Sequence, residues 1–347
     1  MSPAGPCRFP GRPAPLSRPA RRCFAGPLQR LSNLPQMNAS IEATLYSDPA
    51  CPFGYSENPA LRVIEWRYGD QIDWRLVLVG LSESADRYAA SGYTPVRQAQ
   101  GQVMFRDRWG MPFAPVPKPR LAASSRACRA VIAARREWPG SEWAVFRALQ
   151  IANFTTPMLL DDDADLREAL ADVPGIDPDR VLDLIDEPGV VAAYERDKAQ
   201  TRTAAGSPTE LQGKAGNTDG RIRYTAPSVV FTRLADGLAL EAGGMQPVDA
   251  YDVLVANLDP KLERKAPPED PEALLDRFPL GLTTAEVAAI LAPNNAVPDL
   301  AAAERVLIGL LGEGRAERRP LGGDALWMAA GSHPRGGRRA GGSRART

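Results

Sequence analysis

The chain has 347 residues, 44% of them hydrophobic and 24% charged, a composition typical of a globular protein and long enough for two domains. Its net charge is zero, but the two ends hold 11 of the 42 basic residues and no acidic one, so the middle carries 31 basic and 42 acidic residues, a net charge of −11. This acidity argues against nucleic-acid binding by the main body. No run approaches the ~20 apolar residues that a membrane-spanning helix needs.

The two ends have compositions that do not predict folded structure. Residues 1–36 are rich in Pro and Arg and lack the apolar core of a secretory signal, so we interpret them as a disordered extension before Met37, with a transit peptide as the alternative. The tail, residues 331–347, is Gly- and Arg-rich and is also expected to be disordered; it holds the only histidine, His333. A catalytic cysteine–histidine pair is therefore not expected. Without an export signal, we expect a cytoplasmic protein with reduced cysteines.

The first predicted strand leads directly to a cysteine at the start of a helix. Apolar and polar residues alternate over 41–45, which predicts a half-buried strand, and Asp48 with the following proline ends it. Cys51 comes next, and Pro52 suits the first turn of a helix expected over residues 55–68. Because helix N–H groups and the helix dipole stabilise a thiolate, the pattern predicts a reactive Cys51. The alternative is a buried structural cysteine.

The segment from Ser47 to Gly54, Ser-Asp-Pro-Ala-Cys-Pro-Phe-Gly, resembles the active-site loop of the DsbA-like branch of the thioredoxin superfamily. This branch includes disulfide oxidoreductases, polyketide-pathway disulfide isomerases and kappa-class glutathione transferases. The resemblance implies an α/β, thioredoxin-like fold with an all-helical insertion, Cys51 as the catalytic nucleophile, and Pro52, Phe53 and Gly54 in contact with substrate. Gly54 occupies the place of the second cysteine of the dithiol pattern, so the usual local resolving thiol is absent.

The next segments predict a βαβ unit followed by helices. The nearly continuous apolar run over 73–80 predicts a strand buried on both faces and parallel to the first. Residues 81–119 contain five prolines and are expected to be irregular. From about 120 to 205 the sequence is helical, which the resemblance identifies as the insertion. The expected helices cover 121–138, 142–153, 165–171, 179–186 and 190–204.

Cys128 lies on the first of these helices, and two interpretations stay open. On a periodic helix it would be a core residue. In the resembling family this helix borders the active-site groove, and Ser124 and Cys128 have the offset of its groove-lining residues. Cys128 is therefore a candidate resolving cysteine, expected to face the groove close to Cys51.

No metal or tightly bound cofactor is expected. The acidic run over 161–165 lacks the spacing and the glycine of an EF-hand, so it is interpreted as a turn and a helix N-cap. A low-molecular-weight thiol is the one cosubstrate that a site with a single cysteine suggests. The polar, Gly-rich residues 206–223 are expected to form a mobile loop.

A second motif follows that loop. Residues 225–231 predict a strand that begins at Pro227, residues 238–242 a hairpin partner, and residues 246–258 a closing helix. The resemblance implies that the Ala226–Pro227 bond is cis, that Pro227 faces Cys51, and that the backbone of Ala226 binds substrate.

The C-terminal part is predicted to be a separate small unit. After a linker over 260–271, residues 272–330 contain two amphipathic helices, 282–291 and 300–311, and a ribbon over 312–327. This order resembles a winged helix. Its second helix lacks the basic residues that DNA binding requires, so we expect a packing or partner-binding module.

Residues 37–259 are thus predicted to be a DsbA-like domain that acts as a thiol–disulfide oxidoreductase or thiol-transfer enzyme through Cys51, on a protein or small-molecule thiol or disulfide. One alternative is a kappa-transferase-like or isomerase-like enzyme that binds a low-molecular-weight thiol. The other is a thioredoxin-fold binding module without turnover.

Overall fold

The computed structural model describes residues 38–331. The expectations for residues 1–36 and for the tail from residue 332 onward concern residues outside this range, as do Cys7, Cys23 and His333. Within the described range, no helix combines the length and the apolar character required to cross a membrane.

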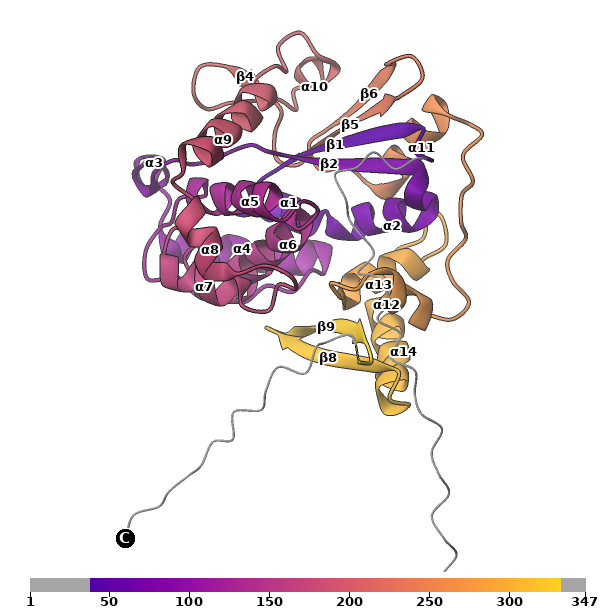
Figure 1. The fold of residues 1–347 in the computed structure, drawn as a ribbon. Coiled ribbons are helices and arrows are strands. Elements are labelled where there is room, and N and C mark those ends of the chain that lie inside the picture. The colour runs from indigo at the N-terminus through magenta and orange to yellow at the C-terminus, as the bar shows by residue number, and fades with distance from the viewer. Residues whose placement is uncertain (1–37, 332–347) are drawn as a thin grey trace, which may run out of the picture. The chain divides into compact units, whose positions relative to one another are not determined.

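A four-stranded sheet, in the order β2-β1-β5-β6, forms the centre of the thioredoxin-like domain (Figure 1). β1 (Ile41–Ser47) is parallel to β2 (Ile72–Leu78) and antiparallel to β5 (Ser228–Arg233), which is antiparallel to β6 (Ala239–Gly243). This arrangement confirms the predicted α/β fold. β1 was expected to be half-buried, but it is buried at all positions except Glu42, because strands pair with both of its edges.

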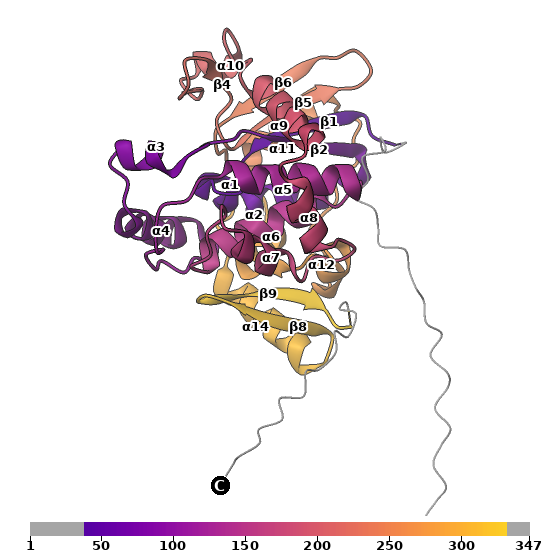
Figure 2. The same ribbon diagram turned by 60° about the vertical axis from the view of Figure 1, so that its left-hand side comes forward.

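The helix predicted after Cys51 is divided in two. α1 (Pro52–Ser56) and α2 (Asn58–Tyr68) are separated by the single residue Glu57, and Pro59 is in the first turn of α2. The prediction of one helix over 55–68 was therefore wrong at its start. A closing helix, α11 (Val248–Leu258), packs against α2, β5 and β6. α9 (Pro188–Thr201) packs against β2 and α5, as the turned view shows (Figure 2).

The segment predicted to be irregular contains two helices, α3 (Ala85–Ala90) and α4 (Pro95–Trp109). Pro95 does not break α4, because it stands in the first turn, where its missing N–H has no partner to lose. The side chain of Thr94 caps the helix by accepting a hydrogen bond from the Arg97 N–H, 3.1 Å long. The other four prolines of the segment follow the helix.

The helical insertion agrees with prediction. After α5 (Ser125–Glu137) its members are α6 (Glu142–Thr155), α7 (Asp163–Leu170), α8 (Pro178–Leu184) and α9. Asp162 caps α7 by accepting hydrogen bonds from two backbone N–H groups, as expected of the acidic run. The predicted mobile loop instead holds a short helix, α10 (Pro208–Leu211), and a two-stranded ladder of β3 (Gly216–Asn217) and β4 (Ile222–Arg223).

The C-terminal unit contains more elements than predicted. Its helices are α12 (Glu272–Arg277), α13 (Thr284–Leu291) and α14 (Leu300–Gly312). Its strands β7 (Leu282–Thr283), β8 (Ala316–Leu321) and β9 (Asp324–Ala329) form a sheet in the order β7-β9-β8. The likeness to a winged helix stays a prediction.

This unit shares its apolar core with the rest of the chain. Val63 and Trp66 of α2 pack into the cluster that contains Val287 and Leu307. A buried ion pair adds to this contact: the Arg147 guanidinium of α6 donates to both carboxylate oxygens of Glu286 in α13, each bond 2.7 Å long.

Candidate functional site

Cys51 lies where the end of β1 meets the start of β5. Because the two strands are antiparallel, the loop after Ser47 and the segment before Ser228 come together at one end of the sheet. The thiol of Cys51 donates a hydrogen bond of 2.9 Å to the carbonyl oxygen of Ala226. The peptide bond between Ala226 and Pro227 is cis. The structure thus brings together Cys51 and Ala226, two residues that the sequence analysis singled out 175 positions apart.

The expected thiolate is not favoured in this arrangement. Cys51 is 4% exposed, and burial raises the pKa of its thiol to about 12. The backbone N–H of Gly54 acts in the opposite direction, lowering the pKa of the thiol, and the carboxyl of Asp48 raises it further. The prediction of a stabilised thiolate was therefore wrong for this structure, because the N–H groups of a five-residue helix do not compensate for the loss of water.

A buried carboxyl group organises the loop that precedes Cys51. Asp48 Oδ2 accepts hydrogen bonds from the Leu81 N–H at 2.8 Å and the Ser124 hydroxyl at 2.9 Å, and Oδ1 accepts one from the Ala50 N–H at 2.9 Å. Burial raises the pKa of Asp48 above its usual value. Sequence reasoning used Asp48 as the end of a strand and as part of the motif over Ser47–Gly54, but gave its carboxyl no role of its own. Its position between a buried strand and Cys51 was the one signal of a larger role.

Cys128 also contacts this carboxyl group. Its thiol donates to Asp48 Oδ2 at 3.5 Å, so Cys128 is on the face of α5 toward the Cys51 loop. It is 0% exposed and belongs to the main apolar core, and burial raises its thiol pKa well above the usual value. Cys128 was expected to face the active-site groove; its thiol is directed toward the Cys51 loop from within the core, and its resolving role stays a prediction. Both Cys51 and Cys128 are free thiols.

Gly54 has the position of a second active-site cysteine. A Cβ atom added to it would be 3.6 Å from the Cys51 Cβ and 4.0 Å from the Cys51 Sγ. The same atom would be only 2.7 Å from the Ser47 hydroxyl. Pro52, the other neighbour in the motif, is the first residue of α1.

Phe53 is 43% exposed and packs edge-on against Phe105 and Trp109. It lines a largely apolar cavity of about 830 Å³, within the usual size range of small-molecule sites. The cavity is also lined by residues of α2, the end of α4, the start of α11 and the segment 292–298 between α13 and α14. Cys51 is not in its lining, so the cavity adjoins the thiol only through Phe53 and α1.

Glu57 is a further buried acid close to this site. Its Oε1 accepts hydrogen bonds from the Tyr251 hydroxyl and, at 3.1 Å, from the Gln246 N–H. Burial raises the pKa of Glu57 to about 8. Because Gln246 lines the cavity beside Phe53, this carboxyl links α1 to the cavity wall.

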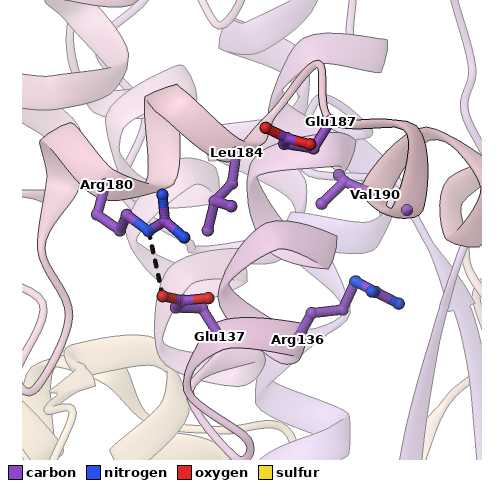
Figure 3. Close-up of a pocket in the computed structure, with 7 residues that line it drawn as sticks. Arg136, Glu137, Arg180, Leu184, Glu187 and Val190 are labelled. Atoms are coloured by element: carbon purple, nitrogen blue, oxygen red, sulfur yellow. Dashed lines mark hydrogen bonds and ion pairs between the residues drawn. The ribbon is translucent and has the colours of Figure 1, made fainter.

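Another cavity, of about 380 Å³, lies on the helical insertion between the end of α5, α8 and α9 (Figure 3). Arg180 donates to Glu137 across it, with a hydrogen bond of 3.1 Å. No residue of the Cys51 site lines it. Within residues 38–331 no group of acidic, histidine or cysteine side chains is placed to hold a metal ion.

The central sheet, the cysteine at the end of β1 and the proline-led strand beside it define a thioredoxin-fold protein of the thiol–disulfide oxidoreductase class. A family model described as the DSBA-like thioredoxin domain matches residues 43–221, more than half of the chain. The chain belongs to this family of thiol–disulfide oxidoreductases. No curated protein matches the sequence.

The chain is similar to two solved structures over most of the length of those proteins. The cytosolic disulfide reductase DsbM from Pseudomonas aeruginosa is 18% identical, with 62% of this chain and 98% of DsbM covered and a TM-score of 0.46. A protein described as a probable DsbA oxidoreductase from Streptomyces coelicolor is 17% identical, with 64% and 91% covered and a TM-score of 0.48.

Proposed function

We propose that this chain catalyses thiol–disulfide exchange with Cys51 as the nucleophile. The observation that carries the proposal is the 2.9 Å hydrogen bond from the Cys51 thiol to the carbonyl of Ala226. The thiol is thereby held against the backbone segment that leads into β5. A disulfide substrate that pairs with this segment would bring its sulfur to Cys51. Ala226 and Pro227 would bind the substrate backbone, and Pro52, Phe53 and Gly54 would contact its other side.

The proposed reaction has two steps. Cys51 loses its proton to water, and its thiolate attacks one sulfur of the substrate disulfide. The substrate S–S bond breaks, a Cys51–substrate disulfide forms, and the departing thiolate takes up a proton. A second thiolate then attacks the substrate sulfur of the mixed disulfide, which releases Cys51 and forms a new disulfide.

A low-molecular-weight thiol is the proposed source of that second thiolate. Gly54 supplies none, and Cys128, the other candidate, is fully buried in the core. Its contact with Asp48 keeps Cys128 close to the Cys51 loop, so a direct bridge between the two thiols is the alternative that the test below separates. We also propose a cytoplasmic location, because free cysteines fit a reducing compartment.

The test compares Cys51→Ser with Cys128→Ala in the reduction of bis(2-hydroxyethyl) disulfide by glutathione. We expect Cys51→Ser to lose the activity while its circular dichroism and melting temperature stay close to those of the parent chain. Cys128→Ala should keep the activity if a small thiol resolves the intermediate. Full activity of Cys51→Ser would refute the proposal, and loss in Cys128→Ala alone would assign the resolving role to that residue.

The buried, protonated state of Cys51 favours a second candidate, a binding module with the fold but without turnover. The two differ in the reactivity of the thiol. If the site opens for catalysis, iodoacetamide should modify Cys51 at neutral pH faster than it modifies Cys128. Equal protection of both thiols, together with no exchange activity, would favour the binding module. The kappa-transferase-like alternative would show a small thiol bound noncovalently.

A further inference from the structure

Arg223 has an unusual environment for an arginine. It is the last residue of β4 and stands three positions before Ala226, whose carbonyl binds Cys51. Arg223 is only 5% exposed. Its Nε donates to the Thr218 hydroxyl at 3.1 Å and its Nη1 to the carbonyl of Tyr224 at 3.0 Å, both uncharged acceptors. Among residues 38–331 no carboxylate is within ion-pair distance of it.

The acid of the same loop is already in use. Asp219 accepts a hydrogen bond of 2.8 Å from Arg202, and it acts on Arg223 only from beyond ion-pair distance. A buried guanidinium without a counterion costs free energy, since it has lost water without gaining a negative charge. An anion supplied by a ligand would remove that cost.

The guanidinium of Arg223 is fixed by its packing. Gly216, its partner in the β3–β4 ladder, lies against it: a Cβ at Gly216 would be 3.0 Å from the Arg223 Cζ. Glycine at this position leaves the room that the guanidinium occupies. Burial lowers the pKa of Arg223, as does Arg202, whereas Asp219, Cys51 and Asp48 act in the opposite direction. Arg223 is linked to the Cys51 site through Tyr224, which accepts its hydrogen bond and packs in one apolar cluster with Cys51 and Ala226.

Two further cationic side chains contact segments close to Arg223 in the fold. Arg87 of α3 donates to the Thr218 carbonyl, which connects α3 to the β3–β4 loop. Lys214 is exposed and packs over Gly243 and Gly244 at the end of β6. In the part of the chain that the structure describes, neither has a carboxylate within ion-pair distance. The Thr225 hydroxyl donates to the Lys214 carbonyl at 2.9 Å, so Arg87 and Lys214 contact the segments on either side of Arg223.

We propose that Arg223, with Arg87 and Lys214 beside it, binds the carboxylate of an anionic low-molecular-weight thiol or of its disulfide. The fork of a guanidinium matches the two oxygens of a carboxylate, which gives this side of the site a preference for acidic over uncharged substrates. The inference rests on the proposed function, because it assigns the substrate class of the same site. Arg223 acts as a specificity residue, and the sulfur chemistry stays with Cys51.

The test measures kcat and KM for two disulfides, glutathione disulfide, which carries carboxylates, and bis(2-hydroxyethyl) disulfide, which has none. In Arg223→Gln we expect kcat/KM for glutathione disulfide to fall roughly tenfold or more, mostly through KM, as for a lost hydrogen bond to a charged group. Uncharged dithiothreitol is the reducing thiol in both reactions, so that the disulfide is the one reactant that differs in charge. The value for bis(2-hydroxyethyl) disulfide should then stay unchanged. Arg221→Gln, an exposed arginine of the same loop, is the matched control and should change neither value.

An equal loss on both disulfides, or no loss on either, would overturn the inference. If Arg223→Gln fails to fold, the surface variant Arg87→Gln/Lys214→Gln makes the same comparison, with a smaller selective loss expected and no selective loss counting against the inference. If the parent chain turns over neither disulfide, the proposed function fails, and calorimetric binding of S-methylglutathione to the parent chain and Arg223→Gln still tests the inference. Equal binding to both would overturn it.

Discussion

Replacing Gly54 with cysteine should convert this single-thiol site into one that forms a disulfide. The Cβ atoms of residues 51 and 54 would be 3.6 Å apart, within the 3.5–4.5 Å range of native disulfides. We expect mild oxidation of Gly54→Cys to produce an intramolecular bridge between Cys51 and the new thiol. The parent chain cannot form this bridge, because Gly54 carries no thiol.

The size of the effect follows from two opposing contributions. Closing a loop of about four residues stabilises the oxidised form by roughly 2 kcal/mol in the chain-entropy relation. The new Cβ would be 2.7 Å from the Ser47 hydroxyl, so that side chain must turn, at a cost of about 0.5–1.5 kcal/mol. The reduced variant should therefore be slightly less stable than the parent chain, and the oxidised variant about as stable or slightly more so.

The assay combines thiol titration before and after oxidation with urea unfolding of both redox forms, and peptide mapping assigns the bridge. Ser47→Ala/Gly54→Cys removes the crowded hydroxyl and should form the bridge with the larger gain in stability. Ser47→Ala alone is the control for loss of the hydroxyl. If residue 54 stays a free thiol after oxidation in both variants, the geometry of the loop described above is wrong.

The remaining predictions concern two buried carboxylates. Arg147→Ala should destabilise the fold by about 3 kcal/mol in urea unfolding, because the buried Glu286 loses both of its hydrogen bonds from a guanidinium and keeps only the longer ion pair with Arg62. Arg147→Met/Glu286→Leu should cost much less, and equal losses would contradict this account. The pKa of Glu57 is raised to about 8 in the folded chain, so the folded state binds this proton more tightly than the unfolded state, whose carboxyl titrates near ~4.3. Its contribution to stability should be complete below about pH 4 and be lost as the pH rises to about 8. Glu57→Gln should weaken this decline, and an unchanged pH profile in that variant would refute the assignment.

The framework of the fold was predictable because its signals are local. Alternating or continuous apolar runs marked β1 and β2, and the order strand, Cys-Pro, helix marked the position of Cys51. The prolines misled the prediction for residues 81–119, since Pro95 begins a helix that the other prolines follow. The break at Glu57 was equally invisible, because a buried acid that accepts a hydrogen bond from Tyr251 depends on a contact 194 residues away.

The properties of the site depend on distant contacts even more strongly. The raised pKa of Cys51 comes from burial, which no residue in its own motif reveals. Asp48 joins Ser124 and Cys128 only after the insertion folds back onto the loop. In the sequence, Arg223 is one cation in a polar stretch. Its burial is seen only in the structure, where β4 pairs with the strand that contains Gly216. Motif reasoning located the candidate thiol, and only the packing showed its surroundings.

The ion pair between Arg147 and Glu286 has a consequence for folding during synthesis on the ribosome. The two residues are 139 positions apart, so Arg147 is synthesised long before its counter-charge. At a synthesis rate of about 5–20 residues per second, Glu286 leaves the ribosome roughly 7–28 seconds after Arg147. During that interval the residues of α2 have been synthesised, but α13, which covers part of the apolar surface of α2, has not. A nascent chain of this protein should therefore depend on chaperones until its C-terminal unit has been translated.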